Sequence, residues 1–125
     1  MEPTKRLGSD QRIRRQTTFK LLSEKGRFVR GSFFYLWACR AEDLGRAPAK
    51  PKPMVGIVVG RKTDSKAVGR NLWKRRIREI FQKHQKDLRQ EALCLIKARP
   101  QVKQPSYEAM EQELVGLFKK AGIWA

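Results

Sequence analysis

The chain has 125 residues, of which 29 are Lys or Arg and 12 are Asp or Glu, for a formal net charge of +17. This length indicates a single domain, and so large an excess of cations favours a polyanionic partner, above all a nucleic acid. The sequence has no apolar run long enough to cross a membrane and no secretory signal, so we expect a cytoplasmic protein without a membrane partner.

The chain begins with a basic arm. Residues 1–16 are polar and rich in Lys and Arg, and we expect them to be loosely ordered. A short helix is predicted over 18–25. Phe19 on this helix either enters the core or, beside Arg14 and Arg15, forms an aromatic platform for an unpaired base.

Two strands are predicted next. Residues 27–30 could form a short strand, and 33–40 form a nearly continuous apolar run rich in aromatic residues. Such a run is typical of a strand that is covered on both faces or turns one face to a ligand. Phe33, Tyr35 and Trp37 alternate and would share one face. The core is the simpler destination for them, but we expect at least one to line an RNA cleft.

The remaining pattern predicts a βαβ unit. Residues 41–53 contain three Pro and form a loop, whereas 54–60 and 92–97 are apolar strands on either side of a long basic segment. Ser106 would cap a final amphipathic helix. The domain, residues 17–125, is therefore predicted to be α+β, with a mixed four-stranded sheet and about three helices in the order α-β-β-β-α-β-α. A right-handed crossover would be the default.

Residues 61–89 carry the strongest signal. They include eleven Lys or Arg and three Asp or Glu, contain no Gly or Pro after Gly69, and predict one long helix. Helical periodicity separates two faces. The apolar stripe comprises Trp73, Ile77, Ile80, Phe81, His84 and Leu88. The second face carries Asn71, Lys74, Arg75, Arg78 and Gln82.

The cations of this helix need an explanation beyond folding. In the first turns they oppose the helix dipole, by about 0.3–1 kcal/mol each when exposed. A solvated charged face is the simpler interpretation. A run of one sign instead favours RNA, because guanidinium groups match phosphate oxygens in bidentate geometry and Asn can reach a base edge or a 2′-hydroxyl. Recognition of DNA is less favoured, because no side chains are spaced to read a major groove.

The run from Lys66 to Glu79, KAVGRNLWKRRIRE, resembles the signature of the protein subunit of bacterial ribonuclease P. That family's motif is Arg-Asn-Arg followed by x-Lys-Arg, on the helix that contacts the RNA subunit. Arg70 and Asn71 match it, whereas Leu72 stands where the second Arg is expected. Further matches are Lys74, Arg75 and Arg78. The resemblance covers roughly residues 12–120.

The resemblance implies a left-handed crossover and two RNA-binding surfaces. The surface for the RNA subunit would comprise Arg61, Lys62, Lys66, Arg70, Asn71, Leu72, Lys74, Arg75 and Arg78. The surface for the single-stranded 5′ leader of precursor tRNA would comprise Arg14, Arg15, Phe19, Phe33, Tyr35 and Trp37. The implied activity is endonucleolytic removal of that leader, with catalysis by the RNA subunit and Mg²⁺ bound mainly by RNA. One protein monomer would join each RNA subunit.

The sequence offers no catalytic constellation of its own. The acidic residues are scattered, His84 falls in the apolar stripe, and Cys39 and Cys94 form no CxxC motif. A zinc site and a disulfide are therefore both disfavoured, and the chain alone should not cut RNA. The alternative function is a non-enzymatic RNA binder, such as a ribosomal protein or RNA chaperone of similar fold. It would share the charge and the helix but would not promote precursor processing.

Overall fold

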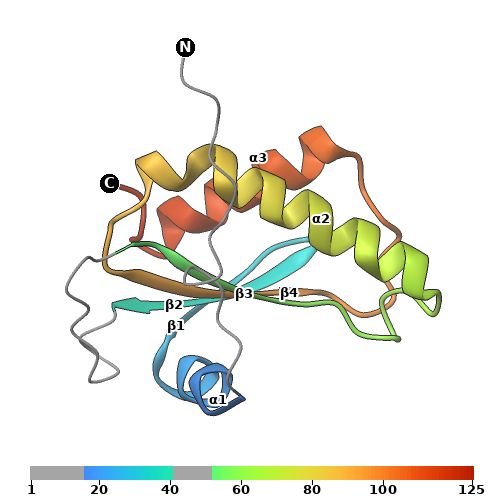
Figure 1. The fold of residues 1–125 in the computed structure, drawn as a ribbon, viewed down its shortest axis with the longest axis horizontal. Helices are drawn as coiled ribbons and strands as arrows, with labels where there is room; N and C mark the ends of the chain where they lie inside the picture. Colours follow the sequence, from blue (N-terminus) through green and yellow to red (C-terminus); the bar gives the residue numbers. More distant parts are fainter. Residues whose placement is uncertain (1–15, 41–51) are drawn as a thin grey trace.

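The computed structural model describes residues 16–40 and 52–125, and side chains in the first helix from Lys20 onward (Figure 1). Residues 1–15 of the predicted arm and nearly all of the 41–53 loop lie outside the described residues, whereas Gln16, predicted as the last residue of the arm, begins the first helix. None of the described helices has the length and apolar character needed to span a membrane. In chain order the elements are α1 (Gln16–Lys25), β1 (Arg27–Arg30), β2 (Phe34–Arg40), β3 (Met54–Val58), α2 (Ala67–His84), the 3₁₀ turn η3 (Gln85–Asp87), β4 (Ala92–Ala98) and α3 (Tyr107–Lys120).

The four strands form one mixed sheet in the order β1-β2-β4-β3. Strand β2 is antiparallel to both β1 and β4, whereas β3 and β4 are parallel. Helix α2 connects the two parallel strands. The predicted βαβ unit, the mixed four-stranded sheet and the element order are therefore confirmed.

Two hydrophobic cores lie on opposite faces of this sheet. Helices α2 and α3 cover one face and α1 lies on the other (Figure 1). The larger core packs Trp73 and Phe81 of α2 and Phe118 of α3 against the sheet. The smaller core packs Leu22 of α1 against β4. Because β4 is covered on both sides, all of its residues except Lys97 are buried, as a continuous apolar run predicts.

The long helix is shorter than the sequence suggests. It was predicted over 61–89, but α2 begins at Ala67 and ends at His84, where a 3₁₀ turn follows. Residues 61–66 instead form a turn held to the end of β4. The Thr63 hydroxyl lies 3.2 and 3.0 Å from the carbonyl oxygens of Ala98 and Arg99, and it donates a hydrogen bond there. These long-range contacts outweigh the helical propensity of the segment.

The two cysteines occupy opposite faces of the sheet. Cys94 is buried in the larger core and the half-buried Cys39 packs against the smaller one, so the two cysteines are not joined in a disulfide. Burial raises the pKa of the Cys94 thiol. The Ser106 cap of α3 is also confirmed, because its hydroxyl accepts a hydrogen bond from the Ala109 amide at 3.2 Å.

Candidate nucleic-acid interface

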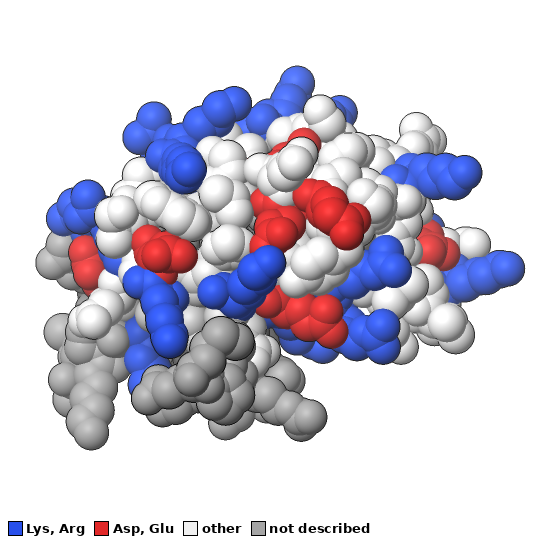
Figure 2. Space-filling view, turned by 90° about the horizontal axis from the view of Figure 1, so that it is seen from above, with Lys and Arg blue, Asp and Glu red and all other residues white. Residues whose placement is uncertain are grey.

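Helix α2 has the two predicted faces. Trp73, Ile77, Ile80 and Phe81 are buried, while the polar face leaves Asn71 and Arg75 exposed and Lys74 and Arg78 partly exposed. Figure 2 shows the face of the molecule that carries α2 and α3, with Lys and Arg gathered along its rim and several acidic side chains toward its middle. The cations are therefore arranged for partners that approach the edges of this face.

The N-terminus of α2 has neither an acidic first turn nor a side-chain cap among the described contacts. Lys66 is the N-cap residue, and its own amide donates to a carboxylate oxygen of Asp64 at 3.0 Å. A Cβ atom at position 69 would clash with that carboxylate, so Gly69 is what allows Asp64 to sit beside the first turn. Lys66 and the nearby Arg61 and Lys62 are exposed. This end of the helix concentrates positive charge at the positive pole of the helix dipole.

Arg70 also makes structural hydrogen bonds that the sequence did not predict. Its Nη1 atom donates to the carbonyl oxygens of Asp64 and Ser65, both at 3.0 Å. The guanidinium therefore fixes the turn before the helix with part of its donor set. Arg75 differs, because its described ion pair is a 3.8 Å contact with Glu79 between side chains that are 69% and 53% exposed. Such a pair contributes little to stability and leaves Arg75 able to bind an anion.

Leu72, the departure from the resembled motif, is partly exposed. Four positions earlier, Val68 is 81% exposed, so α2 also presents apolar surface next to its cations. Helical spacing places Val68 and Leu72 on the same side of the helix. An apolar contact with a ribose or base is therefore compatible with this end of α2.

A cluster of aromatic rings occupies the sheet face that carries α1. The Phe28 ring lies 5.0 Å from Trp37 and 5.6 Å from Tyr35, and the Tyr35 and Trp37 rings are 6.2 Å apart. Two guanidinium groups, those of Arg30 and Arg99, lie 5.9 and 5.2 Å from the centre of the Tyr35 ring. We call these five side chains the aromatic–arginine cluster. Stacking rings beside cations suit an unpaired nucleic-acid strand.

Phe33 does not share this face, contrary to the prediction. Strand β2 begins only at Phe34, and Phe33 lies in the preceding turn, where it packs against the larger core beside α3. The third ring comes from Phe28, which pairs across the strands with Trp37 and is 47% exposed. Sequence reasoning missed Phe28, although alternation in RFVR places it on one face with Arg30.

The turn between β1 and β2 is held by a residue that no sequence motif pointed to. The Glu113 carboxylate on α3 accepts hydrogen bonds from the amides of Ser32, Phe33 and Phe34 at 2.6, 2.7 and 2.9 Å. On the other side, Arg99 donates to the Gly31 carbonyl oxygen at 3.1 Å. These contacts fix where β2 starts and hence which of its side chains face the cluster.

Helix α1 lies beside the aromatic–arginine cluster. Leu22 of α1 belongs to the smaller core, against which Trp37 is also packed. Arg14, Arg15 and the side chain of Phe19 lie outside the described residues, so their predicted contribution to leader binding stays a prediction.

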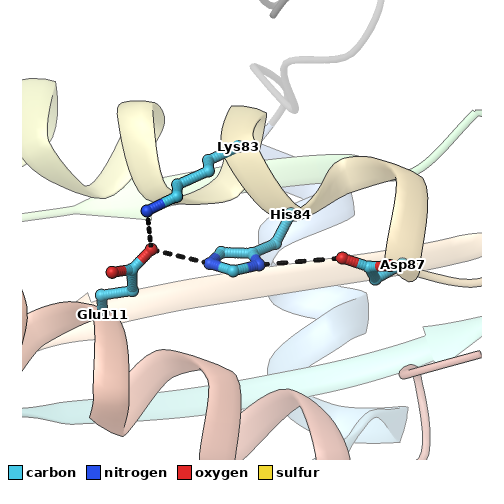
Figure 3. Close-up of polar contacts among 4 residues, drawn as sticks. All are labelled: Lys83, His84, Asp87 and Glu111. Carbon is cyan, nitrogen blue, oxygen red and sulfur yellow. Dashed lines mark hydrogen bonds and ion pairs between the residues drawn. The ribbon is translucent and has the colours of Figure 1, made fainter.

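His84 belongs to a polar junction between α2 and α3 (Figure 3). Its Nε2 atom and the Lys83 ammonium each lie 2.8 Å from the same Glu111 oxygen, and its Nδ1 atom lies 3.8 Å from Asp87. Hydrogen bonds from Lys83 and His84 lower the pKa of Glu111, and the same carboxylate raises the pKa of Lys83. His84 was predicted to lie in the apolar stripe; its ring lies 5.8 Å from that of Trp124 but also within hydrogen-bonding distance of Glu111.

In the described part of the chain, no group of three or more His, Cys, Asp or Glu side chains converges as a metal site would require. The candidate interface therefore consists of cations, an amide-bearing side chain and aromatic rings. Groups of these kinds are suited to binding and orienting a polyanion.

Comparisons with known proteins agree with this picture. The family model for Ribonuclease P matches residues 7–122. A Ribonuclease P protein component from Pediococcus pentosaceus is 41% identical over 62% of this chain and 65% of its own length. Another from Vesicomyosocius okutanii is 27% identical over 92% and 94%. The solved RNase P protein of Staphylococcus aureus superposes with a TM-score of 0.78 at 25% identity, over 92% of this chain and 98% of that one.

Proposed function

Because the chain belongs to the Ribonuclease P family as one of its protein components, we propose how its two surfaces serve the removal of the 5′ leader from precursor tRNA. The α2 surface holds the RNA subunit, and the aromatic–arginine cluster holds the leader. Catalysis belongs to the RNA subunit, and the protein brings two mutually repelling RNAs together by neutralising phosphate charge.

The proposed RNA-subunit surface is the polar face of α2 with the turn before it. Lys74, Arg75 and Arg78 supply the phosphate contacts along the helix, and Arg61 and Lys62 extend the surface past its N-terminus. Arg70 shapes the turn through its bonds to two carbonyl oxygens and offers its remaining donors to RNA. The exposed amide of Asn71 is the group able to recognise a base edge or a 2′-hydroxyl.

The observation that carries the leader assignment is the clustering of Phe28, Tyr35 and Trp37 with Arg30 and Arg99 on one face of the sheet. Stacking tolerates any base, which suits a strand whose sequence varies between precursors. The neighbouring guanidinium groups can neutralise the phosphates between the stacked bases. A duplex would keep its bases buried and could not use this surface.

Mg²⁺ in the assembled enzyme is proposed to reside mainly on the RNA. The described side chains of this interface are cationic, amide or aromatic, and such groups do not suit a hard cation that prefers oxygen ligands. What the protein supplies is charge neutralisation, which lowers the concentration of free Mg²⁺ needed to bring the RNAs together. We further propose that one monomer joins each RNA subunit, in the cytoplasm.

The test is single-turnover cleavage of a 5′-extended precursor tRNA at low Mg²⁺ by the RNA subunit, with and without the protein. We expect strong stimulation by the protein and no cleavage by the protein alone. A precursor with a one-nucleotide leader is the matched substrate, on which the stimulation should be smaller. Tight RNA binding with no stimulation of either substrate would favour the alternative, an RNA chaperone or ribosomal protein.

A further inference from the structure

Another basic site lies on the face of the sheet opposite the aromatic–arginine cluster. There, where β1 begins and β2 ends, a hollow of about 240 Å³ opens between the sheet and the turn after α3. Its rim carries Arg27, Arg40, Arg89 and Glu91. Arg27 and Ala38 of the hollow neighbour Phe28 and Trp37 of the cluster along the strands, but their side chains lie on the opposite face of the sheet, so one ligand group cannot contact both sites. We call this hollow the arginine pocket.

The floor of the arginine pocket is apolar because its side chains are small. Ala38 of β2, Ala92 of β4 and Ala121 after α3 line it together with Ile123, and all four are at least nine-tenths buried. Larger residues at the three Ala positions would fill the hollow. The pocket therefore combines an apolar floor with a charged rim.

Two of the rim cations have no hydrogen-bond or ion-pair partner within the described residues. Arg27 and Arg89 are exposed, and no hydrogen bond or ion pair engages either guanidinium within the described residues. A Cβ atom at Gly122, whose φ is +78°, would lie 3.9 Å from Nη1 of Arg27, so this guanidinium sits over the turn that closes the pocket. The Arg89 backbone is anchored to the same turn by its amide, which donates to the Ile123 carbonyl oxygen at 2.8 Å.

We propose that the arginine pocket binds a nucleoside monophosphate unit. The base would lie on the alanine floor, and the phosphate would be bound by Arg27 and Arg89, whose guanidinium groups match its oxygens. Glu91 on the rim can accept a hydrogen bond from a base or ribose. The hollow is smaller than most drug-sized sites, about 300–1,000 Å³, which limits it to a single nucleotide. The unit comes either from a single-stranded RNA or from a free nucleotide.

The test is binding of 5′-AMP, 5′-UMP, adenosine and inorganic phosphate to the full chain, followed through amide shifts of Gly122 and Ile123 in NMR spectra. We expect the nucleotides to move these amides at lower concentration than either adenosine or phosphate. Equal affinity for phosphate and nucleotide would show that the alanine floor does not bind the base, and this would overturn the proposal. A short single-stranded oligonucleotide that moves the same amides assigns the source to RNA, whereas one that leaves them unmoved assigns it to free nucleotide.

Matched variants separate the loss of a specific contact from the general loss of one positive charge. Arg27→Gln and Arg89→Gln should each weaken 5′-AMP binding about tenfold, as expected for a lost charge-assisted hydrogen bond. Lys103→Gln, which removes one exposed cation beyond the far end of β4, should leave it unchanged. Thermal unfolding of each variant distinguishes nucleotide binding from a structural role. In the structural role, the guanidinium groups would offset the negative end of the α3 dipole. Lower melting temperature with unchanged nucleotide affinity would overturn the proposal.

Discussion

At the scale of single residues, the cations of α2 divide into those that fold the protein and those left for a partner. Arg70 is committed in part to the carbonyl oxygens of Asp64 and Ser65, whereas the contact of Arg75 with Glu79 is long and exposed. Two guanidinium groups that look equivalent in the sequence should therefore respond differently to the same substitution.

Arg75→Gln should weaken binding to the RNA subunit and lower the slope of log affinity against log salt concentration by about one, while leaving stability unchanged. Arg70→Gln should lower both the affinity and the melting temperature, because the turn loses its two hydrogen bonds. Salt-dependent binding and thermal unfolding measure these effects. Lys120→Gln, on the last turn of α3, is the control of equal charge. An unchanged slope for Arg75→Gln would remove Arg75 from the phosphate contact.

Phe28 is the residue whose substitution reports most directly on leader binding. Phe28→Ser should weaken binding of leader-bearing precursor by roughly 1–3 kcal/mol if a base stacks there, and should leave mature tRNA binding unchanged. Val68→Ser, which removes another exposed apolar side chain, is the matched control and should not discriminate between the two RNAs. Equal losses of affinity for both RNAs would show that Phe28 has a structural role and does not contact the leader.

At the scale of elements, the β1–β2 turn is positioned from a distance by α3. Glu113→Gln removes the charge that the exposed amide of Ser32 and the part-buried amides of Phe33 and Phe34 share, and weakening these bonds destabilises the turn. We expect faster hydrogen exchange at Ser32, Phe33 and Phe34, together with weaker binding of leader-bearing precursor. Glu108→Gln, an equal change in charge on the same helix, should not alter exchange in the turn. Unchanged hydrogen exchange in Glu113→Gln would show that the turn is stable without the charge of Glu113.

The elements themselves could be predicted from sequence, because hydrophobic periodicity and caps are local signals. The strands and the faces of α2 follow from them. The missed features depend on partners far along the chain. The turn before α2 needs Thr63 to meet the end of β4, and the true partner of Trp37 depends on the register of β1. Glu113 contacts amides about eighty residues away, which neither spacing nor composition encodes.

At the scale of the whole molecule, the Glu111 junction joins α2 to α3 and makes stability depend on pH. Bonds from Lys83 and His84 lower the pKa of Glu111 below its ordinary value of 4.5. A carboxyl with a depressed pKa in the folded state stabilises the protein above its unfolded pKa, and this contribution is lost as the pH falls through the folded pKa. The α2–α3 interface should therefore weaken below about pH 4.5.

Glu111→Gln should destabilise the protein at neutral pH, and the difference from the unchanged chain should disappear at strongly acidic pH. Urea unfolding at a series of pH values measures both. Glu24→Gln, at an exposed position on α1, is the control and should follow the unchanged chain. A difference that stayed constant down to strongly acidic pH would mean that shape, and not charge, matters at position 111.

The unbalanced N-terminus of α2 has a consequence for the life of the chain before assembly. Cations outnumber the Asp64 carboxylate at the positive pole of this helix, whose first turn has no acidic residue, so the free protein carries repulsion that a bound polyanion relieves. A ligand that binds only the folded state stabilises it. RNA binding should therefore protect the protein from degradation as well as assemble the enzyme. Cells that make more protein than RNA should clear the surplus, so that the amount of protein follows the amount of its RNA.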